Sequence, residues 1–387
     1  MSGRLRVAVV TQYPRDPDRP RGGVEAVSAT LVPALARLED LEVVVVTCEA
    51  GLAGHERSDL GGVEIHRLPR RARRILWEAI GPGRRQMHRV LAALRPDVVH
   101  AHDVYGLMVQ GFPAPRVFTV HGFISADTRV SGERFPRLRS LLWRRLETRG
   151  WAEKHHVVSI SPYVRERLTG IVGGRIHDIE NPVAELFFET ERREEWGTVF
   201  CAGLIERRKN TLALVEALAR LRARGLPARL RLAGSAREPD YAEQVSARIS
   251  AAGLDAHVDL LGPLPRAAVC DELARASVFA LVSLEENAPM GIAEAMAAGV
   301  PVVASDRCGM PYMVREGETG FLVNPLDVGE LAERLASLLG DDARRRAMSE
   351  AARVDARRRF HPQVVALRTR DVYRRAAGAS SRITVAP

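Results

Sequence analysis

The chain has 387 residues, is 46% hydrophobic and 27% charged, and carries a formal net charge of +9. This composition excludes a fully disordered chain, and the length predicts two domains, or three. The longer apolar runs are far shorter than the roughly 20 residues needed to cross a bilayer, and the N-terminus lacks the features of a signal peptide. We therefore expect a cytoplasmic protein with no transmembrane helix.

The charge is unevenly distributed along the chain. Residues 1–180 hold 28 Lys and Arg against 20 Asp and Glu, whereas residues 181–387 hold 29 against 28. A basic face in the N-terminal half would attract phosphates, an anionic membrane or nucleic acid. Because Lys154 and Lys209 are the only lysines of the sequence, a compositional bias toward arginine is an equally simple explanation for most of these charges.

Short apolar runs alternate with longer amphipathic ones in the first half of the chain. The pattern predicts strands over residues 6–10, 42–47, 97–100, 117–120 and 157–160, and helices over residues 24–38 and 138–153. Short, mostly apolar strands separated by helices are typical of parallel βαβ units whose sheet is covered on both faces.

The same pattern restarts in the second half. It predicts strands over residues 198–202, 229–233, 258–260, 278–282 and 301–304, helices over residues 212–224, 242–252, 267–274 and 291–298, and a helical, Arg-rich tail over residues 331–377. Residues 181–197, with Pro182 and an acidic cluster, are the predicted linker. We expect an α/β protein with two Rossmann-like, doubly wound parallel-sheet domains that face a central cleft, where ligands of such sheets bind.

These patterns divide the chain into three parts. We expect an N-terminal Rossmann-like domain over residues 1–180, a C-terminal Rossmann-like domain over residues 181–360 and a C-terminal helix with a tail within residues 361–387. The four cysteines include no CxxC pair, and Asp16 and Asp18 have no third ligand nearby, so we expect neither a disulfide framework nor a metal site.

Two motifs of the first half carry candidate site residues. Gly22 and Gly23 lie between the first strand and a helix, where the backbone can approach a ligand and the helix N-terminus favours an anion; a plain turn explains them equally well. His121 follows a strand at the edge that faces the cleft and can hydrogen-bond a sugar hydroxyl. His100 and His102, which end the preceding strand, either shape an acceptor pocket or simply terminate the strand.

Two motifs of the second half form a candidate anion site. Residues 202–210 place Lys209 on a loop after a strand, where a cation suits a diphosphate. Further on, Pro289 starts a helix whose first amides, those of Met290, Gly291 and Ile292, can hold a phosphate. Two carboxylates flank this helix start, Glu286 and Glu294. They repel phosphate but can accept hydrogens from sugar hydroxyls on either side of it.

The last of these motifs has a strong likeness to a known family. The arrangement of Glu286, seven residues and Glu294, followed by Ala-Met-Ala-Ala-Gly-Val-Pro-Val-Val-Ala, resembles the retaining, metal-independent GT-B glycosyltransferases of family 4 (glycosyl transferases group 1). Supporting segments occur in the family's order at residues 22–23, 97–103, 117–122, 161–163, 181–182 and 318–323. The resemblance thus covers nearly the whole chain and implies a GT-B fold. It also implies that residues 1–180 bind the acceptor and residues 181–360 bind the nucleotide sugar, while the C-terminal helix within residues 361–387 packs back on the N-terminal domain and ends in a flexible tail.

The resemblance also implies roles for individual residues. Catalytic roles fall to His121 at the donor sugar, Glu286 at its hydroxyls and Lys209 at the diphosphate. Donor-binding roles fall to Gly22, Gly23, Arg208, Gly262, Pro263, Asn287, Met290, Gly291, Ile292 and Glu294, of which Glu294 would hold the ribose and residues 262–264 would lie near the base. The implied co-substrate is a nucleoside-diphosphate sugar, with no other cofactor and no metal.

One departure from the family pattern affects the phosphate site. Leu204 stands where the family usually has Arg, so that either Arg207 or Arg208 supplies the missing contact or donor binding is weakened. A second departure is minor, since Asn181 is followed by Pro182 where Gly is common.

The expected function is transfer of a sugar, with retained configuration, to a hydroxyl of a glycan, lipid-linked or small-molecule acceptor. Peripheral contact with an anionic membrane at its inner face is one option for the basic N-terminal half. The alternatives are a nucleotide-sugar epimerase or hydrolase of the same fold, and a catalytically silent nucleotide-sugar-binding partner, which the Leu204 departure favours. Nucleic-acid binding is not expected, because the sequence has no recognisable module for it and only 5% aromatic residues.

Overall fold

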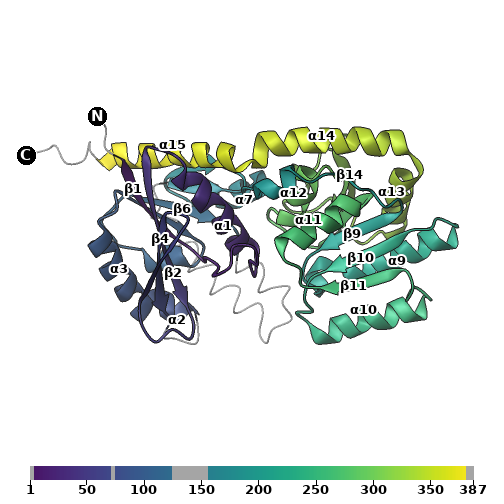
Figure 1. The fold of residues 1–387 in the computed structure, drawn as a ribbon, viewed down its shortest axis with the longest axis horizontal. Coiled ribbons are helices and arrows are strands. Elements are labelled where there is room, and N and C mark those ends of the chain that lie inside the picture. The colour runs from purple at the N-terminus through teal and green to yellow at the C-terminus, as the bar shows by residue number, and fades with distance from the viewer. Residues whose placement is uncertain (1–3, 71–74, 124–155, 381–387) are drawn as a thin grey trace, which may run out of the picture. The chain divides into compact units, whose positions relative to one another are not determined.

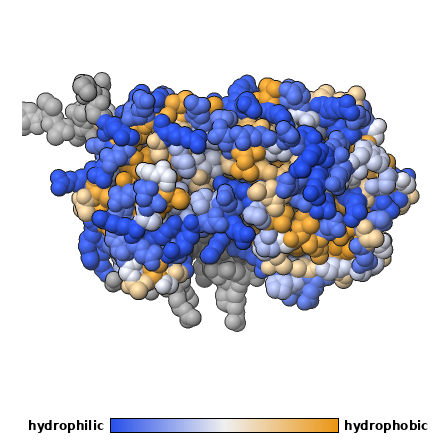
Figure 2. Space-filling view, in the orientation of Figure 1, coloured by the Kyte–Doolittle hydropathy of each residue, from blue (hydrophilic) through white to orange (hydrophobic). Residues whose placement is uncertain are grey.

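The structure is a computed structural model that describes residues 4–70, 75–123 and 156–380. The chain divides into two compact units (Figure 1). Unit 1 comprises residues 1–182 and 362–387, and unit 2 comprises residues 183–361. The helix predicted over residues 138–153 lies outside the described residues. Hydrophilic side chains make up much of the face seen in Figure 2, with hydrophobic ones between them.

Unit 1 is built on an eight-stranded sheet in the order β3-β4-β2-β1-β5-β6-β7-β8. Its strands are β1 (Leu5–Val10), β2 (Leu41–Glu49), β3 (Glu56–Leu60), β4 (Val63–Pro69), β5 (Val98–His102), β6 (Arg116–Val120), β7 (His156–Ser159) and β8 (Arg175–Asp178). All neighbours are parallel except β3, which pairs antiparallel with β4. In the central strand β1, Val7 lies opposite Val43 on one side and Val98 on the other.

Helices pack on both faces of this sheet. They are α1 (Gly23–Ala36), α2 (Ile75–Ile80), α3 (Pro82–Leu94), α4 (Tyr105–Met108), α7 (Pro162–Leu168) and α15 (Pro362–Ser380). Helices α1 and α15 contact each other, α1 contacts β2, and α15 contacts β5 and β6, while α2, α3 and α4 contact one another. The core under α1 and α15 includes Leu35 and Tyr373, both fully buried. Thus α15 is part of unit 1 although it follows unit 2 in the sequence.

Unit 2 is built on a six-stranded parallel sheet in the order β11-β10-β9-β12-β13-β14. The strands are β9 (Thr198–Ala202), β10 (Arg229–Ala233), β11 (Val258–Gly262), β12 (Val278–Leu281), β13 (Val302–Ser305) and β14 (Gly320–Val323). Numbered within the unit, this is the order 3-2-1-4-5-6 of a Rossmann fold. Both units therefore confirm the predicted α/β class with two doubly wound, largely parallel sheets.

The helices of unit 2 form two groups. They are α8 (Glu185–Phe188), α9 (Thr211–Ala223), α10 (Pro239–Ala251), α11 (Arg266–Arg275), α12 (Met290–Ala297), α13 (Val328–Gly340) and α14 (Asp342–Phe360). Helix α9 contacts α10 and α13, whereas α12 contacts α8 and α14. The predicted helical tail is interrupted twice: Asp341 caps α14 by accepting the amide of Arg344 at 2.9 Å, and Pro362 starts α15.

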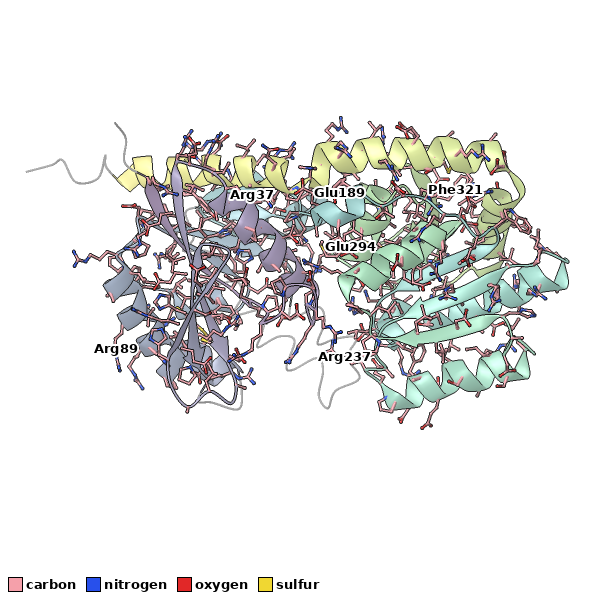
Figure 3. All side chains as sticks on the ribbon, in the orientation of Figure 1. Arg37, Arg89, Glu189, Arg237, Glu294 and Phe321 are labelled. Atoms are coloured by element: carbon pink, nitrogen blue, oxygen red, sulfur yellow. The ribbon has the colours of Figure 1, made fainter. Side chains whose placement is uncertain are left out.

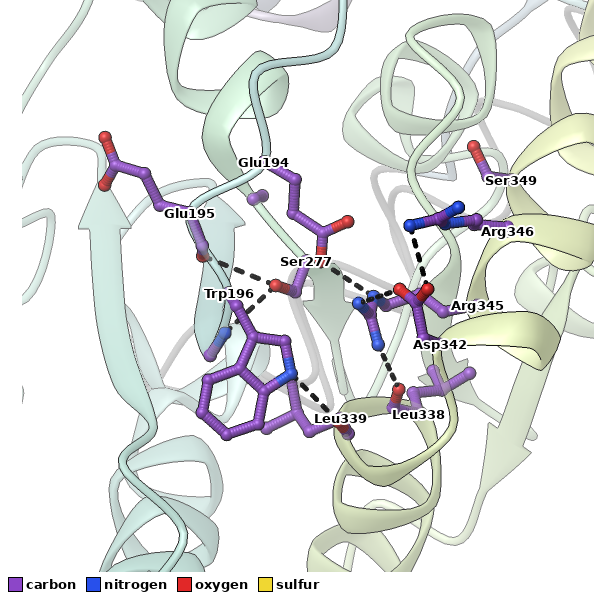
Figure 4. Close-up of polar contacts among 12 residues, drawn as sticks. Glu194, Glu195, Trp196, Ser277, Leu338, Leu339, Asp342, Arg345, Arg346 and Ser349 are labelled. Carbon is purple, nitrogen blue, oxygen red and sulfur yellow. Dashed lines mark hydrogen bonds and ion pairs between the residues drawn. The ribbon is translucent and has the colours of Figure 1, made fainter.

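The stretch predicted to be a linker, residues 181–197, is for the most part integral to unit 2. Phe187 on α8 is 1% exposed and belongs to the core. Beyond α8, Trp196 donates to the carbonyl of Leu339 at 3.1 Å (Figure 4). The buried Arg345 donates to Glu194 at 2.7 Å in the same region. Charged residues at 189–195 gave this stretch the composition of a linker, but its few apolar side chains and its salt bridge anchor it.

Candidate active site

The predicted donor residues of unit 2 gather at one edge of its sheet. Strands β9 and β12 are neighbours, and the chain continues from them to opposite flanks, to β10 and to β13. Such a switch point leaves a crevice at the carboxyl ends of the two strands, where ligands of doubly wound sheets bind. The segments that follow β9 and β12 carry Lys209 and Glu286, so the fold brings these two residues together.

Glu286 is a buried carboxylate held by two cations. Its Oε1 accepts hydrogen bonds from Lys209 Nζ at 2.5 Å and from Arg208 Nη1 at 2.8 Å. Burial by itself would raise the pKa of Glu286, but the attraction of Lys209 and Arg208 outweighs burial and lowers that pKa below its ordinary value. Glu206 also pairs with Arg208, so two carboxylates face these two cations and hold them in place beside Glu286.

The adjacent arginines 207 and 208 point to different places. The guanidinium of Arg207 lies over the ring of Tyr241, 5.4 Å from its centroid. Arg208 instead turns to Glu286, as described above. Arg207 and Arg208 are the two candidates to replace the family arginine that is absent at Leu204. Only Arg208 contacts Glu286 and so joins Lys209 there.

Helix α12 begins four residues after Glu286. Pro289 is its N-cap residue, and the amides of Met290 and Gly291 belong to the first turn, where backbone N–H groups precede the helical hydrogen-bond ladder. The amide of Ile292 donates to the carbonyl of Pro289 at 3.2 Å. The prediction of three available amides is thus wrong for Ile292, because the turn at the helix start already uses it.

A glycine on a neighbouring loop fixes the backbone of residues 286 and 287. The amide of Gly309 donates to the carbonyl of Glu286 at 2.7 Å. A Cβ at position 309 would overlap the carbonyl oxygen of Asn287. The position of the Glu286 carboxylate therefore depends on the lack of a side chain at residue 309.

Glu294 lies on the second turn of α12 and is half-buried (Figure 3). Burial raises its pKa from 4.5 to about 7, and the attraction of Arg266 offsets only part of that rise. Glu294 is thus poised between its neutral and ionised forms at physiological pH. A carboxylate in this state can accept hydrogen bonds from ligand hydroxyls, which is the chemistry predicted for it.

Close backbone contacts join the ends of β9, β10 and β11. Gly262 ends β11 with a φ of +67°, and its carbonyl accepts the amide of Gly234 at 2.8 Å. A Cβ on Gly234 would overlap the carbonyl oxygen of Gly203 after β9. Gly262 and Pro263 therefore follow the same sheet edge that carries Lys209, as the donor-site prediction requires.

In unit 1, Gly22 and Gly23 lie after β1 at the start of α1. Gly22 is the extended N-cap residue of this helix, with a φ of −175°. A Cβ on Gly22 would meet no heavy atom within 4 Å. The carboxylate of Glu25 accepts the amide of Arg21 at 2.8 Å and occupies part of this helix start. The two glycines thus stand at a helix N-terminus, as predicted, with open space at Gly22.

His121 follows β6, is half-buried and lies in a row with the buried imidazoles of His102 and His100. Its Nε2 lies 2.8 Å from Nδ1 of His102, and its side chain also hydrogen-bonds Asn181. His100 in turn lies 2.7 Å from both Tyr373 of α15 and Thr119 of β6. Burial lowers the pKa of His121 to about 4, so its ring is neutral at physiological pH.

Asp103 fixes the backbone at His121. Its Oδ1 accepts the amide of His121 at 2.8 Å, and Asp103 itself has a left-handed φ of +44°. Burial raises its pKa to about 7 although the amides of His121 and Gly122 favour the ionised form. The row also leaves one buried polar atom unsatisfied: among the residues that the structure describes, Nε2 of His102 has no hydrogen-bond partner. His100 and His102 are therefore structural neighbours of His121 and not mere strand ends.

Two residues of these clusters have no distinguishing signal in the sequence. Glu206, which pairs with Arg208, is a single glutamate in a basic loop and carries no pattern. No local feature of the sequence shows that Asp103 receives the amides that follow the next strand. Within residues 4–70, 75–123 and 156–380, no group of three or more His, Cys, Asp or Glu is arranged to hold a metal ion. The helices of those residues include none that is long and apolar enough to span a bilayer.

Two family models match consecutive parts of the chain. The model for Glycosyltransferase Family 4 matches residues 21–185, and that for Glycosyl transferases group 1 matches residues 183–355. The first of these matches lies almost wholly in unit 1, and the second lies in unit 2.

Individual relatives are more distant. The chain is 30% identical over 207 residues to a D-inositol 3-phosphate glycosyltransferase of Corynebacterium aurimucosum, a match that covers 51% of this chain and 48% of the relative. The chain thus matches about half the length of that curated relative.

Solved structures share the fold over nearly the full length. Sucrose-phosphate synthase from Thermosynechococcus elongatus superposes with a TM-score of 0.80 at 21% identity, covering 97% of this chain and all of that one. Anabaena HepE in complex with UDP-glucose superposes with a TM-score of 0.73 at 18% identity, covering 95% and 99%. With both family models matched and this fold in both units, the chain belongs to the GT-B glycosyltransferases of family 4.

Proposed function

We propose that this glycosyltransferase is a metal-independent hexosyltransferase. It moves a sugar from a nucleoside-diphosphate sugar to a hydroxyl of a glycan, lipid-linked or small-molecule acceptor and retains the anomeric configuration. The observation that supports this most is the cluster of Lys209, Arg208 and Glu286 at the switch point of unit 2, just ahead of α12. The similar structure of HepE was solved with UDP-glucose, which favours a donor of that class.

The cluster suits the leaving group of such a donor. Transfer breaks the bond between the anomeric carbon and a phosphate oxygen, so negative charge grows on the departing nucleoside diphosphate. Lys209, Arg208 and the start of α12 are fixed before the reaction, and preorganised charges of this kind stabilise a developing anion effectively. The acceptor oxygen bonds to the anomeric carbon on the same face, and its proton goes to the leaving phosphate oxygen.

The remaining site residues would hold the uncharged parts of the donor. Glu286 and Glu294 would accept hydrogens from sugar and ribose hydroxyls respectively, as the resemblance implies. His121 would contact the donor sugar through a neutral ring, because burial keeps its pKa near 4. Gly22, Gly23, Asn287 and the loop of Gly262 and Pro263 complete the proposed donor contacts.

The departure at Leu204 gives less support to a silent binding partner than the sequence suggested. Arg208 lies next to Lys209 at Glu286, which supports the proposal that it takes the place of the arginine absent at residue 204. An epimerase or a hydrolase would use the same donor site and remains an alternative. Product analysis with and without acceptor distinguishes these activities from transfer.

We also propose that the basic N-terminal half contacts an anionic membrane. Its support is the basic excess of residues 1–180, which also fits a phosphorylated acceptor. Sedimentation with anionic and neutral vesicles tests it, and equal recovery with both would contradict it.

The central test is a donor screen. Ligands of the native state raise its melting temperature, so thermal shifts with a panel of nucleotides and nucleotide sugars identify the donor. The identified donor is then incubated with candidate acceptors, and the anomer of the product is determined by NMR. We expect Glu294→Ala to reduce turnover nearly to zero; a fully active variant, or a chain that no nucleoside diphosphate stabilises, would refute the proposal.

A further inference from the structure

Glu206 is a buried acid in a loop that otherwise carries positive charge. It follows β9 and precedes Arg207, and it is only 4% exposed. Its Oε1 lies 2.7 Å from Arg208 Nη2 in an ion pair that lacks hydrogen-bond geometry, and its Oε2 lies 3.7 Å from Arg237 Nη1. A buried carboxylate is costly unless it is paired, and here two arginines from two loops pair with it.

The backbone fixes Glu206 firmly in this position. The amide of Ile205 donates to the carbonyl of Ser235 at 3.0 Å, and the amide of Arg237 donates back to the carbonyl of Ile205 at 3.2 Å. The carbonyl of Glu206 accepts the amide of Lys209 at 3.0 Å. The carboxylate is therefore held by the loops after β9 and β10 and has little freedom to follow a moving arginine.

The guanidinium of Arg208 is shared between two sides. Its Nη2 faces Glu206, while its Nη1 donates to Glu286 Oε1 and to the carbonyl of Glu285, both at 2.8 Å. A planar guanidinium presents a fixed arrangement of donors that faces two directions at once. Glu206 thus holds one edge of the group and leaves the other edge turned to Glu286 and Lys209.

We propose that Glu206 is a positioning residue of the transferase site, which fixes Arg208 as the second phosphate-binding cation. This inference rests on the proposed function. It explains why a negative charge is buried near a site for a diphosphate, where its repulsion alone would weaken donor binding. Because Leu204 cannot contact phosphate, the site depends on Arg208, which Glu206 holds in place from the side away from Glu286.

A purely structural role predicts a different outcome from a positioning role. If Glu206 only neutralises buried arginines, its loss lowers stability and leaves the kinetics of the folded fraction unchanged. If it only repels the donor, its loss tightens donor binding. If it positions Arg208, its loss lowers kcat, because a displaced guanidinium stabilises the departing phosphate poorly.

The experiment compares steady-state kinetics of four proteins with the donor found in the screen. We expect Glu206→Gln to lower kcat about tenfold or more and Glu206→Asp to restore part of the loss. Glu238→Gln is the matched control, since Glu238 lies 3.5 Å from Arg207 Nε, in an ion pair outside the cluster. Melting temperatures are measured in parallel, and activities are normalised to folded protein.

Chemical rescue supplies a second readout. Free guanidinium at millimolar concentration should restore part of the activity of Arg208→Ala, because Glu206 can hold the small cation where the side chain stood. It should restore much less in the double variant Glu206→Gln/Arg208→Ala.

The outcomes separate the two proposals. A wild-type protein that transfers no sugar refutes the proposed function and this inference together. An active wild-type protein with unchanged kinetics in Glu206→Gln, or with equal rescue in both backgrounds, overturns the positioning role alone.

Discussion

The raised pKa of Glu294 predicts a pH-dependent stability that a single substitution removes. Between the ordinary value of 4.5 and about 7, the unfolded chain loses this proton while the folded chain keeps it. The unfolded state then binds fewer protons, so the free energy of unfolding falls as the pH rises through this window. Below pH 4.5 the group makes no difference, and above pH 7 the full penalty of the buried charge is present.

The size of the effect follows from the shift in pKa. A rise from 4.5 to about 7 sets an upper limit of about 3 kcal/mol, at 1.36 kcal/mol per pKa unit. Since Glu294 is partly exposed, we expect water to reduce this to about 1–2 kcal/mol. Glu294→Gln carries no charge at any pH, so it should melt several degrees above the wild type at pH 8, at about 2–4 °C per kcal/mol for a unit of this size.

Calorimetry of both proteins from pH 5 to pH 8 tests the prediction. The difference between their melting temperatures should grow with pH, and it isolates Glu294 because other titrating groups, such as Asp103, are common to both proteins. The exposed Glu189→Gln serves as control and should follow the wild type at every pH. A difference between wild type and Glu294→Gln that stays constant over this range would refute the reasoning.

Three further predictions concern the donor site. Lys209→Ala should raise the donor KM about tenfold or more, since it removes a cation 2.5 Å from Glu286. The control Arg207→Ala should leave the donor KM unchanged. If titrations of initial rate against donor give equal effects for both variants, the assignment of Lys209 to the donor site is contradicted. Gly309→Val should destabilise the protein by about 1–3 kcal/mol and abolish donor-induced thermal shifts, because the new Cβ overlaps the backbone of residue 287. The control Gly340→Ala has open space at its Cβ and should keep the donor-induced thermal shifts. Transfer should continue after dialysis against EDTA; activity that is lost and then restored by a divalent cation would contradict metal independence.

The sequence predicted the central strands of both sheets because their burial makes them apolar. Residues such as Val43–Val46 read as strand at any position in the chain. The sequence patterns do not predict β3, β4, β8 or β14. The residues of β3 and β8 are polar and largely exposed, and their position is set by pairing with β4 and β7. Strand β4 is interrupted by Glu64, His66 and Arg67, and β14 has only the four residues Gly320–Val323, so neither gives a clear periodic signal.

The site could be predicted as far as it depends on local motifs. Spacing placed Glu286 before the helix and Glu294 inside it, and the structure has both there. The orientation of the Arg208 side chain could not be predicted, because its guanidinium pairs both with Glu206, two residues before it, and with Glu286 on another loop. The use of the Ile292 amide depends on the tight turn at Pro289, which the sequence does not distinguish from a regular helix start.

The return of α15 to unit 1 has a consequence for synthesis on the ribosome. Residues 183–361 form unit 2 without interruption, so unit 2 can fold as soon as residue 361 has left the ribosome. In unit 1, the apolar face of the sheet on which Val365 and Tyr373 pack stays uncovered until α15 has been synthesised. The later half is thus completed before the earlier one, against the usual N-terminal-first order. A chain that stops at residue 361 would leave this apolar face uncovered and would remove the Tyr373 hydroxyl that lies 2.7 Å from His100.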